Sequence, residues 1–564
     1  MKFIKYLIFV FSISSCQDFL DRPPLDAIGP ESYWRSATDL ENYVLQFYPS
    51  FPGHGTWYGG YGYDIVNADN AINVIPNVIL NGERGIAGGR WTSNWTSIRS
   101  VNIFFDNYQK CEDDFDTYKH FLGEAYFFRA WYYLELLKQY GDVPWYETEL
   151  KPDDEEDLMK ARDPRTLVAD NIIADLDLAI EHLDFRNEVG NNRINKEAAL
   201  AFKSRVGLFE GTWQKYHANT VFGTSGGNPA RYFQATVDAA EELMSGNYQT
   251  GLHDNYYEMF GMDDMSDVDE ILMYRTYNIN DGVLNDVQYA TTFAPVGVGI
   301  TWSMVTSYLD RAGSPFDYMA LAENSKGNDF LSRVANEIDL RYSASVWTPG
   351  DLVVERNGST FDKPGIDQVD ISLNPTGFQL KKCSNPSSPG AGVGGGGSGE
   401  TGYILFRYGE VLVNYAEALY ELEGVVAFDA LNQIRARAGM PDFVVNAQTE
   451  DHHRLDYGYP ISDELYEIRR ERRVELALEG HRADDYRRWA AHDLFIGKRP
   501  KGYPFNQSEY PDFNPPLDEN GLIDFFQNRL PNGFQFRENQ DYLNPIPVVE
   551  LTLNPNLTQN PGWQ

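Results

Sequence analysis

Aromatic and amide side chains gather in one glycine-rich segment early in the chain. Residues 53–63 hold Trp57, Tyr58, Tyr61 and Tyr63 between glycines, and Asp64, Asn67, Asp69 and Asn70 follow. A flat ring covers the C–H face of a sugar at little ordering cost, while carboxylate and amide groups form directed hydrogen bonds with hydroxyls. The pattern predicts a platform for a hydroxyl-rich ring made by Trp57, Tyr58, Tyr61, Asp69 and Asn70. The alternative is that these rings anchor the loop to the body of the protein.

A second irregular segment carries Tyr289 and then Trp302, which stands just before a predicted helix over residues 304–310. We expect Tyr289 and Trp302 to contribute to the same kind of binding site, with core packing as the alternative for Trp302. Trp91 and Trp95 are four residues apart at the start of another predicted helix, and that spacing assigns them mainly to the core.

Motifs for catalysis and metal binding are weak. Residues 223–227 fit G-x-S-x-G, but the preceding residues are polar and Pro229 follows closely, so the strand–turn–helix context is missing. The acidic residues between 263 and 270 lack the central glycine of a calcium loop and are predicted to form a solvated turn. His452 and His453 are adjacent and point apart on any regular element.

We therefore predict no catalytic residue, no metal site and no cofactor. A glycoside hydrolase, the alternative, would need two carboxylates about 5 or 6.5–9.5 Å apart, and no such pair stands out.

Residues 1–15 have the features of a lipoprotein signal peptide. Lys2 and Lys5 precede a short apolar run, and small residues lead to Cys16. The run is too short to cross a bilayer, which takes about twenty residues. Because residues 13–16 resemble a bacterial lipobox, we expect lipidation of Cys16, with an ordinary secretory signal as the alternative. Residues 16–30 contain three prolines and are expected to form an extended tether. Whether Cys111 and Cys383 pair stays open.

The composition is that of a folded, acidic protein. Apolar residues make up 42% of the 564 residues and charged residues 23%, which excludes a largely disordered chain. The formal net charge is −36, so the surface as a whole repels phosphate backbones. Nucleic acid is therefore excluded as an expected partner, and strongly anionic glycans are mildly disfavoured.

Helices are the dominant predicted elements. Apolar residues recur at steps of three and four over residues 121–140, 165–184, 195–213, 403–423, 427–438 and 463–490. Short connections join them into helical hairpins with a weak internal repeat. In the last stretch arginines alternate with glutamates, which predicts salt bridges that hold neighbouring helices.

Long irregular segments separate these helices, at residues 51–90, 217–230, 276–301, 343–402 and 500–545. Loops of this length in a compact chain are usually functional. The glycine-rich run 389–402 is expected to be a mobile surface excursion. Because helical hairpins stand on both sides of it, residues 31–564 are predicted to form a single body.

Several segments together resemble one protein family. The runs at 406–418 (FRYGEVLVNYAEA), 431–439 (LNQIRARAG) and 471–482 (ERRVELALEGHR), with Asp485, Arg488 and Trp489, are similar to the C-terminal half of the SusD/RagB family of Bacteroidetes outer-membrane lipoproteins. Residues 16–21, 123–130 and 140–144 resemble its N-terminal half, and residues 545–547 and 554–562 its tail. The resemblance spans nearly the whole mature chain.

The resemblance implies a mostly α-helical body of tetratricopeptide-like hairpins that carries long irregular loop excursions. It also implies a lipid-anchored protein on the outer face of the outer membrane, which captures oligosaccharide or polysaccharide and lids a SusC-like TonB-dependent transporter. The region of Trp302 often lines the ligand pocket in this family. The alternatives are a peptide-binding RagB-type protein, a secreted glycoside hydrolase and a purely structural helical scaffold.

Overall fold

The computed structural model describes residues 33–86 and 89–563, apart from the side chain of Tyr58. The expected signal peptide (1–15) and tether (16–30), including Cys16, lie outside the described residues. The principal helices are α3 (Ala37–Leu45), α4 (Trp91–Phe105), α5 (Phe115–Tyr140), α6 (Glu155–Leu158), α7 (Arg165–His182), α8 (Arg186–Val189), α9 (Lys196–Tyr216), α10 (Pro229–Met244), α11 (Tyr256–Gly261), α12 (Val287–Thr292), α13 (Trp302–Val305), α14 (Tyr318–Asn324), α15 (Gly327–Glu337), α16 (Arg341–Ser345), α17 (Tyr408–Glu423), α18 (Phe428–Arg437), α19 (Asp463–Glu475), α20 (Arg482–Arg488) and α21 (Val548–Leu553). The strands are β1 (Ala71–Asn73), β2 (Ile271–Arg275), β3 (Val298–Ile300), β4 (Leu352–Val354), β5 (Ser359–Thr360) and β6 (Tyr403–Arg407).

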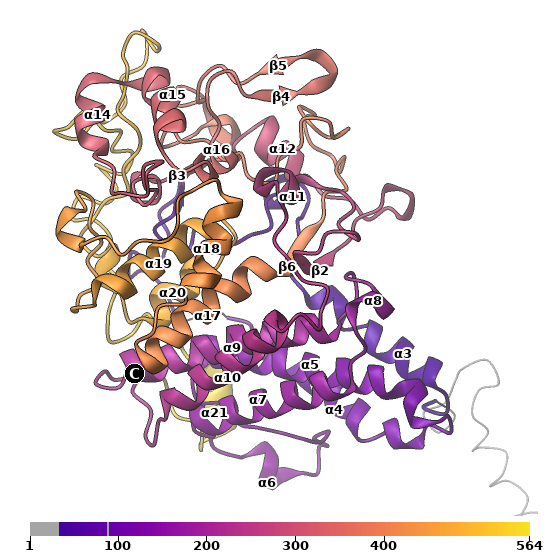
Figure 1. Ribbon diagram of the computed structural model, residues 1–564. Coiled ribbons are helices and arrows are strands. Elements are labelled where there is room, and N and C mark those ends of the chain that lie inside the picture. The colour runs from indigo at the N-terminus through magenta and orange to yellow at the C-terminus, as the bar shows by residue number, and fades with distance from the viewer. Residues whose placement is uncertain (1–32, 87–88, 564) are drawn as a thin grey trace, which may run out of the picture.

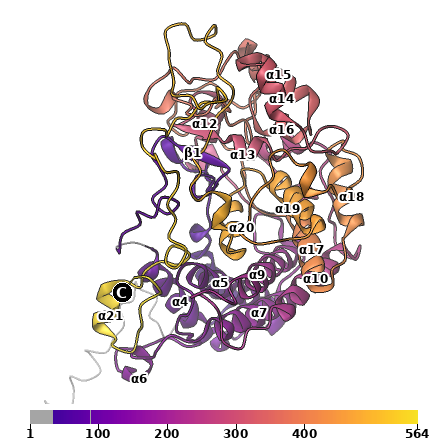
Figure 2. The ribbon, with the colours of Figure 1, turned by 90° about the vertical axis from the view of Figure 1, so that its left-hand side faces the viewer.

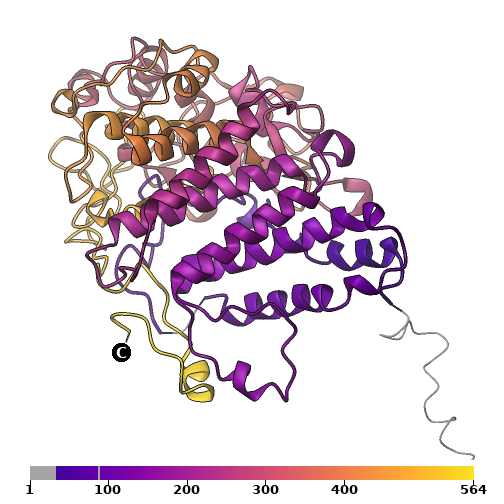
Figure 3. The same cartoon turned by 60° about the horizontal axis from the view of Figure 1, so that its bottom comes forward.

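The long helices form a layer in which neighbours pack along their length (Figures 1 and 3). Helix α5 packs against α3, α4 and α7, and α9 packs against α7, α10 and α17. Close approach of α9 to α10 depends on Gly207, because a Cβ there would lie 2.6 Å from the carbonyl oxygen of Tyr232. The predicted mostly helical fold of tetratricopeptide-like hairpins is therefore confirmed.

Three predicted helices differ from the structure. The helix expected over residues 304–310 is the short helix α13, which spans Trp302–Val305. Residues 403–407 form strand β6, which pairs antiparallel with β2, and the helix begins only at Tyr408. The predicted helix 463–490 is broken into α19 and α20 because Leu478 and Gly480 adopt left-handed backbone angles, with φ of 65° and 87°. The break turns the chain so that Arg482 and Arg473 approach the same carboxylate, that of Asp69.

The irregular segments form a second region on top of the helical layer (Figures 1 and 2). It contains three two-stranded sheets, β1 with β3, β2 with β6 and β4 with β5. The β1–β3 pair joins segments far apart in the sequence, with Ala71 opposite Ile300 and Asn73 opposite Val298. This pairing brings the predicted platform segment and the Trp302 segment together.

The glycine-rich run 389–402 is held to the body, contrary to the expectation of a free excursion. The Gly397 N–H donates to Oδ1 of buried Asp286 at 2.8 Å, and the Gly392 N–H donates to Thr292 Oγ1 at 2.8 Å. Asn285 and Gly399 also exchange backbone hydrogen bonds of 2.9 Å. Backbone groups thus supply the contacts that the missing side chains do not.

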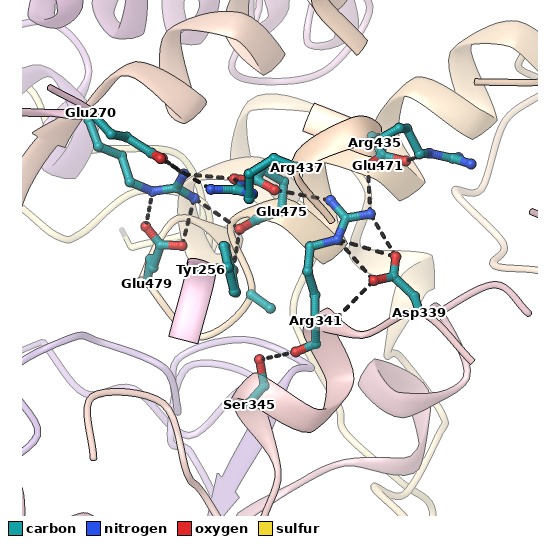
Figure 4. A network of polar contacts seen from close by, with 12 residues as sticks. Tyr256, Glu270, Asp339, Arg341, Ser345, Arg435, Arg437, Glu471, Glu475 and Glu479 are labelled. Carbon is teal, nitrogen blue, oxygen red and sulfur yellow. Dashed lines mark hydrogen bonds and ion pairs between the residues drawn. The ribbon is translucent and has the colours of Figure 1, made fainter. Parts of the chain in front are cut away.

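A network of buried ion pairs joins the two regions (Figure 4). Arg407 of β6 contacts Glu270 at 2.8 Å and both Glu475 and Glu479 at 2.7 Å. Arg341 of α16 also contacts Glu475, at 3.0 Å. Glu270 was expected in a solvated acidic turn; that expectation is wrong, because its side chain is buried against arginines. The predicted salt bridges of α19 are confirmed, with partners mostly on other elements, such as Glu417 for Arg469 and Asp485 for Arg472.

Candidate functional site

A cavity of about 270 Å³ opens beside Trp302, and we call it the Trp302 pocket. Its lining combines an aromatic ring, hydroxyl groups, apolar side chains and cations. The lining residues are Asp69, Ile72, Thr301, Trp302, Ser303, Thr306, His452, His453, Arg454, Leu455, Leu494, Phe495, Lys498, Arg499, Pro500, Lys501 and Phe534. Two predicted site residues, Asp69 and Trp302, therefore meet at one cavity although 233 positions separate them.

Backbone contacts fix the position of Trp302. Strand β3 leads directly into Thr301, whose hydroxyl donates to the Asp69 carbonyl at 2.6 Å and accepts the Met304 N–H at 3.2 Å, capping α13. The Trp302 N–H donates to the Lys501 carbonyl at 2.8 Å. The indole lies nearly parallel to the Phe330 ring, with centroids 5.7 Å apart and an interplanar angle of 25°. Only 9% of Trp302 is exposed, so it forms a rigid wall of the pocket rather than an open loop ring.

Asp69 and Asn70 have a structural role in this arrangement. Asp69 is 7% exposed and accepts hydrogen bonds from Arg482 at 2.7 Å and from Arg473 at 3.0 Å. Burial alone would raise the pKa of Asp69, but the charges of Arg473 and Arg482 outweigh burial and hold it well below its usual range. Asn70 Oδ1 accepts from Arg473 Nε at 2.9 Å. Asp69 and Asn70 hold the two arginines in place, and Arg473 in turn donates a hydrogen bond to Ser303 of the pocket lining.

Tyr61 and Tyr289 also lie inward. The Tyr61 hydroxyl donates to the Leu478 carbonyl at 3.0 Å, and its ring packs against His54 and Tyr63. Tyr289 is buried on α12 with its ring stacked on Phe293 at 5.5 Å. The structure therefore replaces the expected open platform with rings that anchor the loops, which was the alternative interpretation.

Among the predicted site residues whose side chains are described, Trp57 is the exposed one, with 54% of its surface accessible. Its backbone has a φ of 50°, and its N–H donates to Asp286 Oδ2 at 2.7 Å. A Cβ on Gly395 would lie 3.0 Å from the Trp57 ring, so the glycine run covers part of that ring. Phe293 is equally exposed and lies beside Gly394. We call Trp57, Phe293 and residues 394–397 the Trp57 surface. Tyr58 belongs to the same turn, but its side chain lies outside the described part of the chain.

The sequence reasoning missed the cationic side of the Trp302 pocket. Residues 498–501 read Lys-Arg-Pro-Lys, an unusual run in a chain with a net charge of −36, and that run was the available signal. His453, considered only as a metal ligand, lies edge-on to Trp302 with centroids 5.8 Å apart. Its Nε2 is buried without a hydrogen-bond partner in the described residues. Burial lowers the pKa of His453, which favours the neutral imidazole.

Two larger hollows lie in the helical region. One, of about 660 Å³, is walled by Trp131, Lys138, Arg205 and Asp484; Lys138 pairs with Asp484, and Arg205 pairs with Glu410. The other, of about 590 Å³, lies beside Trp95, whose ring centroid is 5.7 Å from that of Tyr146. The Trp302 pocket differs from both in its place, because it is lined by the segments that hold the predicted residues Asp69 and Trp302.

Three further features concern disulfide bonding, a catalytic motif and membrane-spanning helices. Cys111 and Cys383 are both free thiols. Residues 223–227 lie in the turn between α9 and α10, with a helix instead of a strand before them. Across the described ranges 33–86 and 89–563, no helix is both long enough and apolar enough to cross a membrane.

Comparison with known proteins identifies the family. The model of the SusD family matches residues 269–563, and a second family model, described as starch-binding associating with outer membrane, matches residues 65–208. SusD-like protein P2 of Formosa agariphila is 23% identical over 576 residues, which cover 99% of each chain.

Solved structures show the same fold. A SusD-like carbohydrate-binding protein from Bacteroides fragilis superposes with a TM-score of 0.71 at 21% identity, covering 93% of this chain and 99% of that one. Another SusD-like protein from the same organism gives a TM-score of 0.71 at 20% identity, with 96% and 100% covered. Since the first family model covers more than half of the sequence and the fold agrees over nearly all of it, this chain belongs to the SusD family.

Proposed function

We propose that this protein is a non-catalytic lipoprotein of the outer cell surface that captures oligosaccharide or polysaccharide and delivers it to a SusC-like TonB-dependent transporter. Membership of the SusD family supports the proposal, as does the description of the family model over residues 65–208 as starch-binding and associating with the outer membrane. The lipobox-like sequence before Cys16 supports the anchor.

The observation that carries glycan capture is the combination of groups in the Trp302 pocket. A fixed indole forms one wall, and Ser303, Thr306 and His453 border the same space. Sugars need an apolar wall for their C–H faces and directed polar groups for their hydroxyls. The exposed Trp57 surface offers an additional contact for a longer chain.

We propose that the pocket is not catalytic because the Asp69 carboxyl group is held in its ionised form. Among the described residues that line the pocket, Asp69 carries the one carboxylate, and two arginines hold it ionised. A general acid must be protonated near neutral pH, which Asp69 is not. Glycosidic hydrolysis also requires a second carboxylate within about 9.5 Å across the sugar.

An array of neutral and acidic polysaccharides and of peptides tests the ligand class. The mature body should be retained by glycan and should release no new reducing ends during incubation. Retention by peptides alone would replace this proposal with peptide capture, and release of reducing ends would indicate a hydrolase.

Delivery requires a partner, and stable protein interfaces typically bury more than about 1,200 Å² in total. Gentle solubilisation of outer membranes followed by affinity purification of this protein should recover a β-barrel of the TonB-dependent type. Recovery of the lipoprotein alone after mild cross-linking would remove the import step from the proposal.

A further inference from the structure

We propose that the saccharide bound in the Trp302 pocket carries an anionic group, either a carboxylate or a sulfate ester, which binds beside Lys498 and Arg454. This inference rests on the proposed glycan capture and names the chemical class of its ligand. It reverses the expectation from the net charge of the whole chain, which disfavours anionic glycans.

The charges that line the pocket are opposite to those of the protein. Four lining residues are cationic, namely Arg454, Lys498, Arg499 and Lys501, and one is anionic, Asp69. The whole chain contains 83 acidic and 47 basic residues. The pocket is therefore a cationic site in an acidic protein.

Part of this charge is already neutralised within the protein. Arg499 and Lys501 contact Asp524 at 2.8 and 2.6 Å. Asp69 is neutralised in turn by Arg473 and Arg482, which lie behind the pocket wall. The pocket cations without a carboxylate partner in the described residues are Lys498 and Arg454.

Lys498 is held in place by neutral groups. Its Nζ donates to the carbonyl of Asp493 at 2.7 Å and to that of Leu494 at 3.2 Å. An ammonium group has three N–H donors, so one remains for a ligand while the other two fix the position of the charge. Such preorganisation lowers the entropy that binding would otherwise cost.

Arg454 lies in the loop between α18 and α19 and is exposed. Its backbone N–H donates to the Asp451 carbonyl at 3.2 Å, which fixes the loop. A guanidinium group presents five N–H donors in a planar fork that matches two oxygens of a carboxylate or a sulfate. Lys498 and Arg454 thus provide a point charge and a fork at the same cavity.

The distance over which charges act determines whether a bound ligand is affected by the charges of the pocket or by the net charge of the whole chain. At physiological ionic strength the Debye length is about 8 Å, so exposed charges farther away are largely screened. A ligand group in contact with Lys498 therefore experiences mainly the charges close to it, among which Lys498 and Arg454 are the pocket cations without a carboxylate partner in the described residues. The negative surface slows the approach of a polyanion, but it does not set the affinity of the bound sugar.

The experiment compares saccharides that differ only in charge. The full mature lipoprotein in detergent is titrated with oligogalacturonate and with its methyl ester, and with sulfated and desulfated carrageenan oligosaccharides. We expect the charged member of at least one pair to bind at least tenfold more tightly at about 0.05 M salt, with a smaller advantage at about 0.5 M because salt screens the ion pairs. The pair that responds distinguishes a carboxylate ligand from a sulfate ligand.

The double variant Lys498→Gln/Arg454→Gln should lose this preference. The control Lys110→Gln/Arg311→Gln removes the same charge from exposed positions outside the pocket lining and should retain it. Equal binding of both members of each pair, or unchanged preference in the pocket variant, would overturn the anionic class and leave glycan capture intact. Failure of both pairs while a neutral polysaccharide is retained would also overturn it, and retention of no glycan at all would remove the proposed function too.

Discussion

Most of the Trp302 side chain is buried against other residues, and a small part of it lines the pocket. Its ring contacts Phe330, Tyr318, Phe378 and His453, each with ring centroids within 6.4 Å. A residue buried in this way contributes to stability in addition to its proposed role in binding. A loss of glycan affinity in a Trp302 variant is therefore interpretable only beside a measurement of stability.

Truncation of Trp302 should destabilise the protein. Trp302→Ala is expected to lower the free energy of unfolding by about 3–5 kcal/mol, because it leaves a cavity against Phe330. Trp57→Ala is the matched control and should cost less than about 1 kcal/mol, since Trp57 is 54% exposed. Denaturant titration measures both values. Equal losses in the two variants would contradict the burial described for Trp302.

The proposed lipid anchor depends on Cys16. If its thiol carries the lipid, Cys16→Ala should move the protein from the membrane fraction to the soluble fraction, because one acyl-bearing residue supplies the hydrophobic attachment. Fractionation in cells that lack the proposed transporter measures this without retention by that transporter. Continued membrane association there would rule out the lipoprotein assignment.

At the scale of elements, buried ion pairs connect β6 to α16, α18 and α19. Arg407→Met should cost about 3–5 kcal/mol, because removal of one partner leaves buried carboxylates of Glu270, Glu475 and Glu479 undercompensated. The matched control is Arg35→Met, whose ion pair with Glu112 is exposed and is worth at most about 1 kcal/mol. Thermal melting or urea unfolding compares the two. A loss for Arg407→Met no larger than that for the control would show that the network does not hold the elements together.

The carboxylates of α17 should make stability depend on pH. Burial alone would raise the pKa of Glu410 and Glu417, but Arg205 and Arg488 respectively outweigh burial and lower each pKa to about 2. Because the folded pKa lies below the unfolded value of 4.5, the stabilisation is complete above about pH 4.5. It is lost as the pH falls towards about 2, and it is on the order of 3 kcal/mol for each group.

The midpoint of urea unfolding should therefore hold steady between pH 7 and 5 and fall steeply between pH 4 and 2. Glu417→Gln should flatten part of that decline, because the amide does not titrate. A midpoint that stays constant down to pH 2.5 would be incompatible with these ion pairs.

Element types were predictable where local pattern determines them. The three- and four-residue periodicity predicted α7, α9 and α18 to within three residues at each end, and it predicted α5 from its seventh residue onward and the end of α17. Residues 403–407 were missed because their strand depends on pairing with β2, more than 120 residues earlier. The break after Glu475 was missed because Leu478 takes a left-handed conformation that its residue type does not favour.

At the scale of the whole molecule, the helical layer supports a loop region that carries the candidate site. Aromatic residues in irregular segments led to the prediction of Trp302 and Trp57 as site residues, and the aromatic and amide pattern, together with the family resemblance, predicted a sugar ligand. The sequence could not show that Asp69 forms ion pairs with two arginines or that Lys498 borders the same pocket. Those facts depend on long-range contacts between β1, α19, α20 and residues 498–501.

The most direct test of glycan capture at the Trp302 pocket is a calorimetric titration with a glycan that retains the protein on the array. The wild type is compared with Ser303→Phe, which fills the pocket, and with Ser332→Phe, which makes the same change at a half-buried position outside it. Thermal melting confirms that both variants are folded. We predict that the wild type and Ser332→Phe bind with equal affinity and that Ser303→Phe binds at least tenfold more weakly. Wild-type affinity in a folded Ser303→Phe variant would contradict binding at this pocket.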